Sequence, residues 1–187
     1  MNLYAEESPL KGVFVLRPRI FGDDRGFFFE SFNSKSFAKE TGLSFEFVQD
    51  NHSRSSRGVL RGLHYQVKKP QGKLVRVVEG SIFDVAVDIR EGSPTFGKWV
   101  GAELTAENKK QLWVPPDFAH GFVVTSQSAQ VLYKATDFYS PDHERSIVWD
   151  DETIAIDWPD IGMSPILSAK DADASTLENA DLPTYKL

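Results

Sequence analysis

The stretch KLVRVVEGSIFDVAVDI (73–89) decides the fold class of this chain. Two runs of β-branched and other apolar residues flank Glu79-Gly80, which predicts two strands joined by a two-residue hairpin turn. In the second run the apolar positions alternate with other residue types: Phe83, Val85, Val87 and Ile89 against Asp84, Ala86, Asp88 and Arg90. This period of two predicts an antiparallel strand with one core face and one polar face.

Similar short runs continue on both sides of this stretch. They predict further strands over 12–16, 26–32, 44–50, 58–66, 97–104, 111–114, 121–125 and 130–139. One helix is expected over 35–41, with Ser34 as its N-cap and Gly42 as its stop. From 141 onward the periodicity is weak and prolines recur, so loops and short helices are expected there.

About ten short strands with hardly any helix must close into a sandwich, a jelly roll or a barrel. We expect an all-β, cupin-type jelly-roll barrel with a few short helices. A length of 187 residues without internal repeats fits one domain over 1–187. Its jelly-roll core would cover about 12–140, and the segment 141–187 would pack on that barrel.

Composition excludes several function classes. A net charge of −6 is the wrong sign for binding a nucleic-acid backbone. The longest apolar run, Val13 to Leu16, is far shorter than the about 20 residues that cross a membrane. The chain has no cysteine, which removes thiolate chemistry and disulfides and suits a reducing cytoplasm, the expected location. A small anion held by a few local cations remains open as a ligand.

The four histidines differ in context. His52 and His143 lie in polar, turn-like segments and are expected to be solvated. His64 lies within an apolar strand, where an imidazole is either a hydrogen-bonded core residue or a base in a cavity. His120 lies in the segment PPDFAH (115–120).

The surroundings of His64 and His120 approach the two metal-binding motifs of cupins. However, Gln66 stands where metal-binding cupins place a second histidine, and Pro70 or Gln71 stands at the glutamate position. Neutral amides are poor ligands for first-row metals. We therefore expect a cupin-like pocket without a metal, in which His64 is free to move protons.

Cations also fall within apolar strands near His64. Arg61, Lys73 and Arg76 are costly to bury unless an anion compensates them, although solvated edge positions would also explain them. Strict alternation puts Arg61 and His64 on opposite faces of one strand. A bulge at Gly62 would bring both inward.

Two tyrosines lie on one predicted strand, 130–139. Tyr133 and Tyr139 share a face but are roughly 20 Å apart if the strand is straight. They then cannot act on one atom, whereas a long ligand could meet both. The alternative is that each is a core or interface tyrosine with a satisfied hydroxyl.

Seven segments together resemble the dTDP-4-dehydrorhamnose 3,5-epimerase family. They are DDRGFFFESFN (23–33), FVQDNHSRS (47–55), GVLRGLHYQ (58–66), QGKLVRVVEGSIFDVAVDIR (71–90), WVPPDFAHGF (113–122), YKATDFYSPDHERSIVWDD (133–151) and LSAKDAD (167–173). The resemblance implies a homodimeric cupin-type barrel without metal or cofactor, acting in dTDP-L-rhamnose biosynthesis. The implied reaction inverts C3 and C5 of dTDP-4-dehydro-6-deoxy-D-glucose and gives dTDP-4-dehydro-L-rhamnose.

The resemblance also implies residue roles. His64 would be the base, with Asp171 as its carboxylate partner; Tyr133 would be the acid on the opposite face, and Lys73 would stabilise the enolate. Tyr139 would stack on the thymine. The implied contacts to the nucleotide sugar are Arg25, Glu30, Gln49, Asn51, Arg61, His120, Glu144 and Lys170. Asp84 is a further candidate partner for His120.

Three other functions stay open from the residues. They are a nucleotide-sugar epimerase that inverts only C5 or only C3, a metal-dependent cupin, and a non-catalytic carbohydrate-binding barrel. The last would explain the fold but not a base, an acid and a cation in one pocket.

Overall fold

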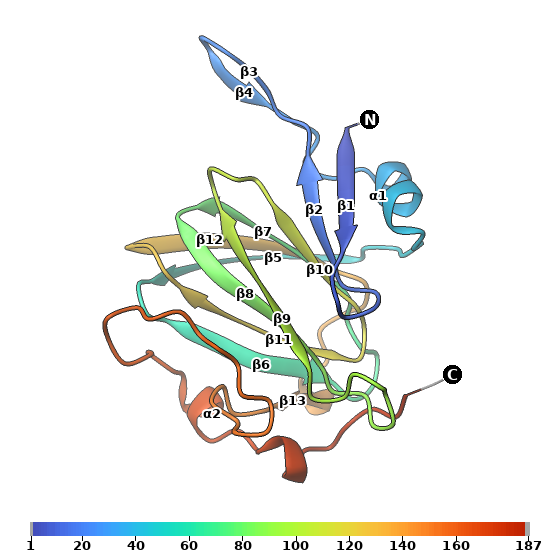
Figure 1. Ribbon diagram of the computed structural model, residues 1–187, viewed down its shortest axis with the longest axis vertical. Coiled ribbons are helices and arrows are strands. Elements are labelled where there is room, and N and C mark those ends of the chain that lie inside the picture. The colour runs from blue at the N-terminus through green and yellow to red at the C-terminus, as the bar shows by residue number, and fades with distance from the viewer. Residues whose placement is uncertain (1, 186–187) are drawn as a thin grey trace.

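The computed structural model describes residues 2–185 of the chain, and within them two antiparallel sheets face each other as a flattened barrel (Figure 1). One sheet has six strands in the order β1-β2-β10-β7-β12-β5: Leu3–Glu7, Phe14–Pro18, Gln111–Val114, Lys73–Glu79, Ser128–Ala135 and Gln49–Ser56. The other has five in the order β13-β6-β11-β8-β9: Glu144–Ser146, Leu60–Gln66, Phe118–Val124, Ser81–Asp88 and Trp99–Thr105. The predicted all-β jelly roll is confirmed.

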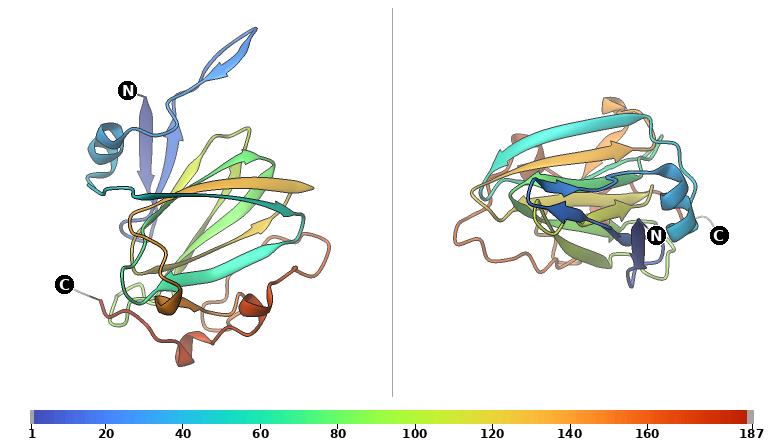
Figure 2. Two further views of the ribbon diagram at one scale, coloured as in Figure 1. Left: turned by 180° about the vertical axis from the view of Figure 1, so that it is seen from behind. Right: turned by 90° about the horizontal axis from the view of Figure 1, so that it is seen from above.

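Few other elements accompany the sheets. A small ribbon pairs β3 (Phe21–Asp23) with β4 (Gly26–Phe28). The helical elements of the described chain are α1 (Ser34–Thr41), η1 (Pro141–His143), α2 (Ala169–Ala172) and η2 (Leu177–Asn179). The C-terminal segment runs along the outside of the five-stranded sheet (Figure 2). No helix among residues 2–185 has the length and apolar character to cross a membrane.

The hairpin predicted at Glu79-Gly80 is wrong, although both strands are present. β7 and β8 belong to different sheets, so the chain crosses from one wall of the barrel to the other at this corner. Gly80 has a φ of 74°, and a Cβ there would collide with the carbonyl oxygen of Ser128. The turn signal was correct, but each strand finds its partners elsewhere.

The two faces of β8 are also assigned differently from the prediction. Ala86 packs with Val75 of the opposite sheet, so the face that it shares with Asp84 looks into the barrel. The apolar face, with Val85 and Val87, packs under the C-terminal segment. Both faces are therefore buried, and Asp84 lies inside the barrel.

The segment between β4 and β5 explains further differences. The strand predicted over 26–32 ends early, at Phe28, and the strand predicted over 44–50 starts late, at Gln49. Between them the chain crosses the outside of the six-stranded sheet and packs aromatic rings around Trp113. Helix α1 starts one residue earlier than predicted. Its N-cap is Asn33, not Ser34, and the Asn33 side chain accepts hydrogen bonds from two backbone amides. Gly42 ends the helix as predicted.

Candidate active site

A bulge in β6 sets the directions of Arg61 and His64. His64 lies opposite His120 of β11 and Arg61 lies opposite Phe122, so three residue steps on β6 match two on β11. The extra residue brings Arg61 and His64 onto the same face, which confirms the predicted bulge. Gly62 has a φ of 122° there, and a Cβ would collide with the backbone of β11.

His64 is held by a buried carboxylate. Its Nε2 donates to Asp171 Oδ1 at 2.5 Å, and Asp171 lies in α2 with only 3% of its surface exposed. Ser168 Oγ donates to the other Asp171 oxygen at 2.7 Å. Burial raises the pKa of Asp171, but the hydrogen bonds from His64 and Ser168 outweigh it and lower the pKa to about 2. Asp171 is thus ionised and holds the proton of His64 on Nε2, which leaves Nδ1 as the basic nitrogen.

A pocket of about 70 Å³ lies beside His64. The side chains that could do chemistry in it come from both walls of the barrel and from its mouth: His64 on β6, Lys73 on β7, Tyr133 on β12, Tyr139 after β12 and Glu144 on β13. Residues far apart in the sequence thus share one enclosed site.

Lys73 is buried and Tyr133 is half-buried in this pocket. The Lys73 ammonium makes no hydrogen bond or ion pair with residues 2–185. Burial lowers the pKa of Lys73 to about 8, against the opposing effect of nearby carboxylates. Burial, followed by the charge of Glu144, raises the pKa of Tyr133, so its hydroxyl keeps its proton at neutral pH.

Tyr139 lies at the rim of the same pocket. Strand β12 ends at Ala135, so the strand predicted over 130–139 is too long and Tyr133 and Tyr139 are not joined by a straight strand; both line this pocket. The Tyr139 hydroxyl donates to Glu144 Oε2 at 2.6 Å, and Lys170 Nζ approaches the same oxygen at 2.6 Å. These three residues form a polar chain across the mouth, while the Tyr139 ring is half exposed.

His120 is part of a second buried pair. Its Nε2 donates to Asp84 Oδ1 at 2.7 Å, and both side chains lie inside the barrel. Burial lowers the pKa of His120 against the opposing effect of Asp84. Because His120 and His64 are register partners on neighbouring strands, their side chains leave the sheet on the same face.

The edge strand β5 adds polar groups near the pocket. Gln49 donates to Asn51 Oδ1 at 3.1 Å and accepts from the backbone amide of Tyr139 at 3.0 Å. Arg61 of β6 donates to the hydroxyl of the buried residue Ser55, which lies on β5. The inner face of β5 and the bulged end of β6 therefore carry polar groups that are linked by hydrogen bonds.

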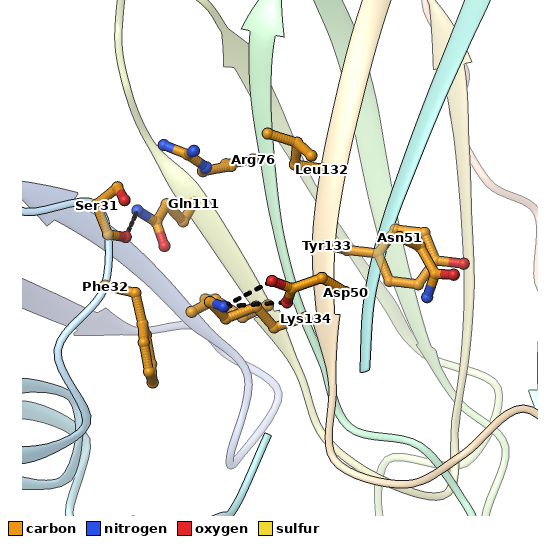
Figure 3. A pocket seen from close by; sticks show the side chains of 10 residues that line it. Ser31, Phe32, Asp50, Asn51, Arg76, Gln111, Leu132, Tyr133 and Lys134 are labelled. Atoms are coloured by element: carbon orange, nitrogen blue, oxygen red, sulfur yellow. Dashed lines mark hydrogen bonds and ion pairs between the residues drawn. The ribbon is translucent and has the colours of Figure 1, made fainter. Parts of the chain in front are cut away.

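A second, larger pocket of about 240 Å³ lies outside the six-stranded sheet (Figure 3). An ion pair joins Lys134 to Asp50 in it, and Arg76 lines its wall. In Figure 3 the Tyr133 and Asn51 side chains lie on the other side of the sheet from Lys134. Arg76 therefore lies on the other face of the sheet from the buried Lys73, and Arg61 on β6 is exposed, which corrects the expectation that the three cations share a buried position.

Two predicted binding residues lie away from the 70 Å³ pocket in this chain. Arg25 is at the tip of the β3-β4 ribbon with 90% of its side chain exposed, and Glu30 follows the ribbon. His52 is solvated as predicted but lies on strand β5 rather than in a turn, and His143 is half-buried in η1, where its Nδ1 contacts Ser140 Oγ at 2.8 Å; neither lines the pocket. Within residues 2–185 no group of three or more His, Asp or Glu side chains could hold a metal ion.

Comparison with known proteins gives a consistent result. The family model described as dTDP-4-dehydrorhamnose 3,5-epimerase matches residues 7–179. The enzyme of that name from Pseudomonas aeruginosa is 60% identical over 95% of this chain and 97% of its own length, and that from Shigella flexneri is 56% identical over 97% and 98%. The crystal structure of a Legionella pneumophila dTDP-6-deoxy-D-glucose-3,5-epimerase with dTDP-4-keto-L-rhamnose superposes with a TM-score of 0.96 at 51% identity, covering 99% of this chain and 100% of that one.

Proposed function

Since this chain belongs to the dTDP-4-dehydrorhamnose 3,5-epimerase family, we propose that His64, Tyr133 and Lys73 carry out the family's reaction in the 70 Å³ pocket. The protein is an isomerase that inverts C3 and C5 of dTDP-4-dehydro-6-deoxy-D-glucose in dTDP-L-rhamnose synthesis. The assignment of each residue to a step is the proposal.

One observation carries the assignment. His64 belongs to the five-stranded sheet and Tyr133 to the six-stranded sheet, and both line the pocket between them. Inversion at a carbon needs a proton removed from one face and another delivered to the opposite face. A base and an acid on opposite walls of a barrel meet this requirement.

The proton movements then follow from the protonation states. The ketone at C4 acidifies the hydrogens on C3 and C5, and Nδ1 of His64 removes one of them. The negatively charged Asp171 stabilises the imidazolium that forms. The enolate oxygen faces the Lys73 ammonium, which stabilises it strongly because the pocket is small and buried. Tyr133 donates its proton to the other face, and solvent restores both groups before the second carbon reacts.

Labelling with deuterium tests this function. Incubation of the protein with dTDP-4-dehydro-6-deoxy-D-glucose in D₂O should place deuterium at both C3 and C5, as read by NMR of the sugar. Label at one carbon alone would reduce the activity to single-site epimerisation. Absence of label would exclude the epimerase and leave a carbohydrate-binding barrel, whereas activity that requires a bound metal would favour a metal-dependent cupin.

We propose that the rest of the nucleotide sugar binds at the pocket mouth and along the polar groups of β5 and Arg61. We assign the thymine to the exposed Tyr139 ring and the diphosphate to Arg61, whose planar guanidinium can bind two oxygens at once. Gln49, Asn51, His120, Glu144 and Lys170 are the further proposed contacts. In this arrangement the sugar reaches the buried end of the site and the base stays at its rim.

We also propose that the protein is a homodimer in which the β3-β4 ribbon completes the partner's site. The ribbon projects away from the barrel (Figure 1) and exposes Phe27 by 62% and Phe28 by 73%. Exposed aromatic patches of this kind are typical of interfaces. Arg25 and Glu30 would then reach a pocket that they do not reach in their own chain.

Mixing two inactive variants tests the shared site. Arg25→Ala and His64→Ala homodimers, mixed and allowed to exchange subunits, should regain about a quarter of the wild-type activity, because each heterodimer has one intact site. A mixture of His64→Ala with Tyr133→Phe should regain none, since both lesions lie in the barrel of their own chain. If the Arg25 mixture stays inactive although subunits exchange, the proposal that Arg25 acts across the dimer is wrong.

A further inference from the structure

The carboxylate of Asp84 is buried with an unused oxygen. Asp84 is 0% exposed, and its Oδ1 accepts the hydrogen bond from His120. Its Oδ2 is buried and has no hydrogen-bond partner among the described residues. Burying a carboxylate in this way is strongly unfavourable unless a cation lies close by.

The His120 imidazole does not supply that cation. Burial lowers the pKa of His120, so its ring is neutral near pH 7 and above. It orients the Asp84 carboxylate through one hydrogen bond but leaves the charge of Asp84 uncompensated. The charge therefore acts on the next cation inside the barrel.

That cation is Lys73 on the facing wall. The Lys73 side chain points inward from β7, on the same face as Val75. The Lys73 ammonium has no hydrogen-bonded partner among residues 2–185. Asp84 and Lys73 interact electrostatically across the barrel without forming an ion pair. The ammonium is thus favoured by a nearby charge but stays available to an oxygen of the substrate.

We propose that Asp84 is a positioning residue that keeps Lys73 protonated for enolate stabilisation and so sets the upper pH limit of epimerisation. This inference rests on the role of Lys73 given under the proposed function. Its chemical logic is that a cation fully paired with a carboxylate would bind the enolate weakly, whereas an unassisted buried lysine would lose its proton.

Other groups around Lys73 define what the test must separate. They are Glu144 on β13, Lys170 on α2, His64 on β6, His120 on β11, Tyr133 on β12, and Tyr139 and Asp117 at the pocket wall. Glu144 favours the Lys73 ammonium more than Asp84 does, but Glu144 is itself bound by Lys170 and Tyr139 at the mouth, and the Lys170 charge disfavours the ammonium. Tyr133 loses its proton only above its usual range, so the first group to lose a proton needed for the reaction as pH rises is Lys73.

The test is the pH profile of kcat in Asp84→Asn. Removing the charge should move the alkaline limb of the profile to lower pH by about one unit, while Asp84→Glu, which keeps the charge, should leave the limb within a few tenths of its place. The matched control is Asp88→Asn, which removes another fully buried carboxylate of β8 that is bound by Arg90 instead. A limb that stays in place in folded Asp84→Asn overturns the inference.

A second variant covers the case in which Asp84→Asn does not fold. Asp84→Ser leaves space for a formate ion, which can replace the missing carboxylate. Added formate should return the alkaline limb of the pH profile to its wild-type position, whereas chloride at equal ionic strength should not. If formate does not return the limb, the inference is wrong. Lys73→Met separates the two proposals. If Lys73→Met keeps wild-type deuterium exchange, the proposed role of Lys73 is wrong. If Lys73→Met loses exchange but the alkaline limb of the pH profile stays in place in the Asp84 variants, only the inference about Asp84 is wrong.

Discussion

Replacement of His64 by alanine is expected to lower kcat and deuterium exchange at both carbons by about 100- to 10,000-fold, the usual contribution of a general base. The reason is that the pocket holds one basic nitrogen positioned by a buried carboxylate, His64 Nδ1 opposite the Asp171 contact. Binding of dTDP, measured by calorimetry, should remain, because Tyr139 and Arg61 are unchanged.

The matched control for this variant is His52→Ala. His52 lies on the outside of the six-stranded sheet, where its Nε2 contacts Gln130 at 2.8 Å, and it is remote from the pocket. Its replacement should leave exchange at the wild-type rate. Survival of exchange in folded His64→Ala would show that another group is the base.

Replacement of Tyr133 by phenylalanine is expected to lower formation of the inverted product by a similar factor, about 100- to 10,000-fold. Exchange should persist, because His64 can remove a proton and return a deuteron to the same face of the carbon. The substrate would therefore gain deuterium with its configuration retained, which NMR of the recovered sugar distinguishes from inversion. The phenyl ring keeps the packing of Tyr133 and removes only the hydroxyl.

Tyr4→Phe serves as the control for loss of a tyrosine hydroxyl. Tyr4 is 55% exposed on β1 and does not line the pocket, so its replacement should leave product formation unchanged. Inverted product at the wild-type rate from Tyr133→Phe would contradict its role as the acid. Loss of exchange together with loss of product would show instead that Tyr133 is needed before the first proton is removed.

Local chemistry made much of the site predictable. The bulge at Gly62 could be inferred because Arg61 and His64 cannot otherwise share a face, and the structure has that bulge. Gln66 in place of a metal-binding histidine carried the expectation that His64 moves protons. Such inferences work because each depends on a few neighbouring residues and on the fixed period of a strand.

Pairing and faces were less predictable. Glu79-Gly80 has the composition of a hairpin turn, yet the same residues form a corner between two sheets, because turn chemistry does not say which edge a strand will pair with. The alternation in β8 identified two faces but not which of them looks into the barrel. The sequence therefore puts Asp84 on a polar face but does not predict that it is buried. The unpaired Oδ2 of Asp84 is a feature of the packed structure and cannot be inferred from the sequence.

By itself the amino-acid sequence determined an all-β chain without thiols, with a base, an acid and a cation on apolar strands, because residue type and period are local properties. Only the tertiary structure decided that Tyr139 joins Tyr133 at one pocket, that Arg76 faces outward and that Asp84 lies inside the barrel facing Lys73. These outcomes depend on where β12 ends and on which sheet each strand enters. Strand ends and strand partners are set by packing between distant segments, and that information appears only when the two sheets close on each other.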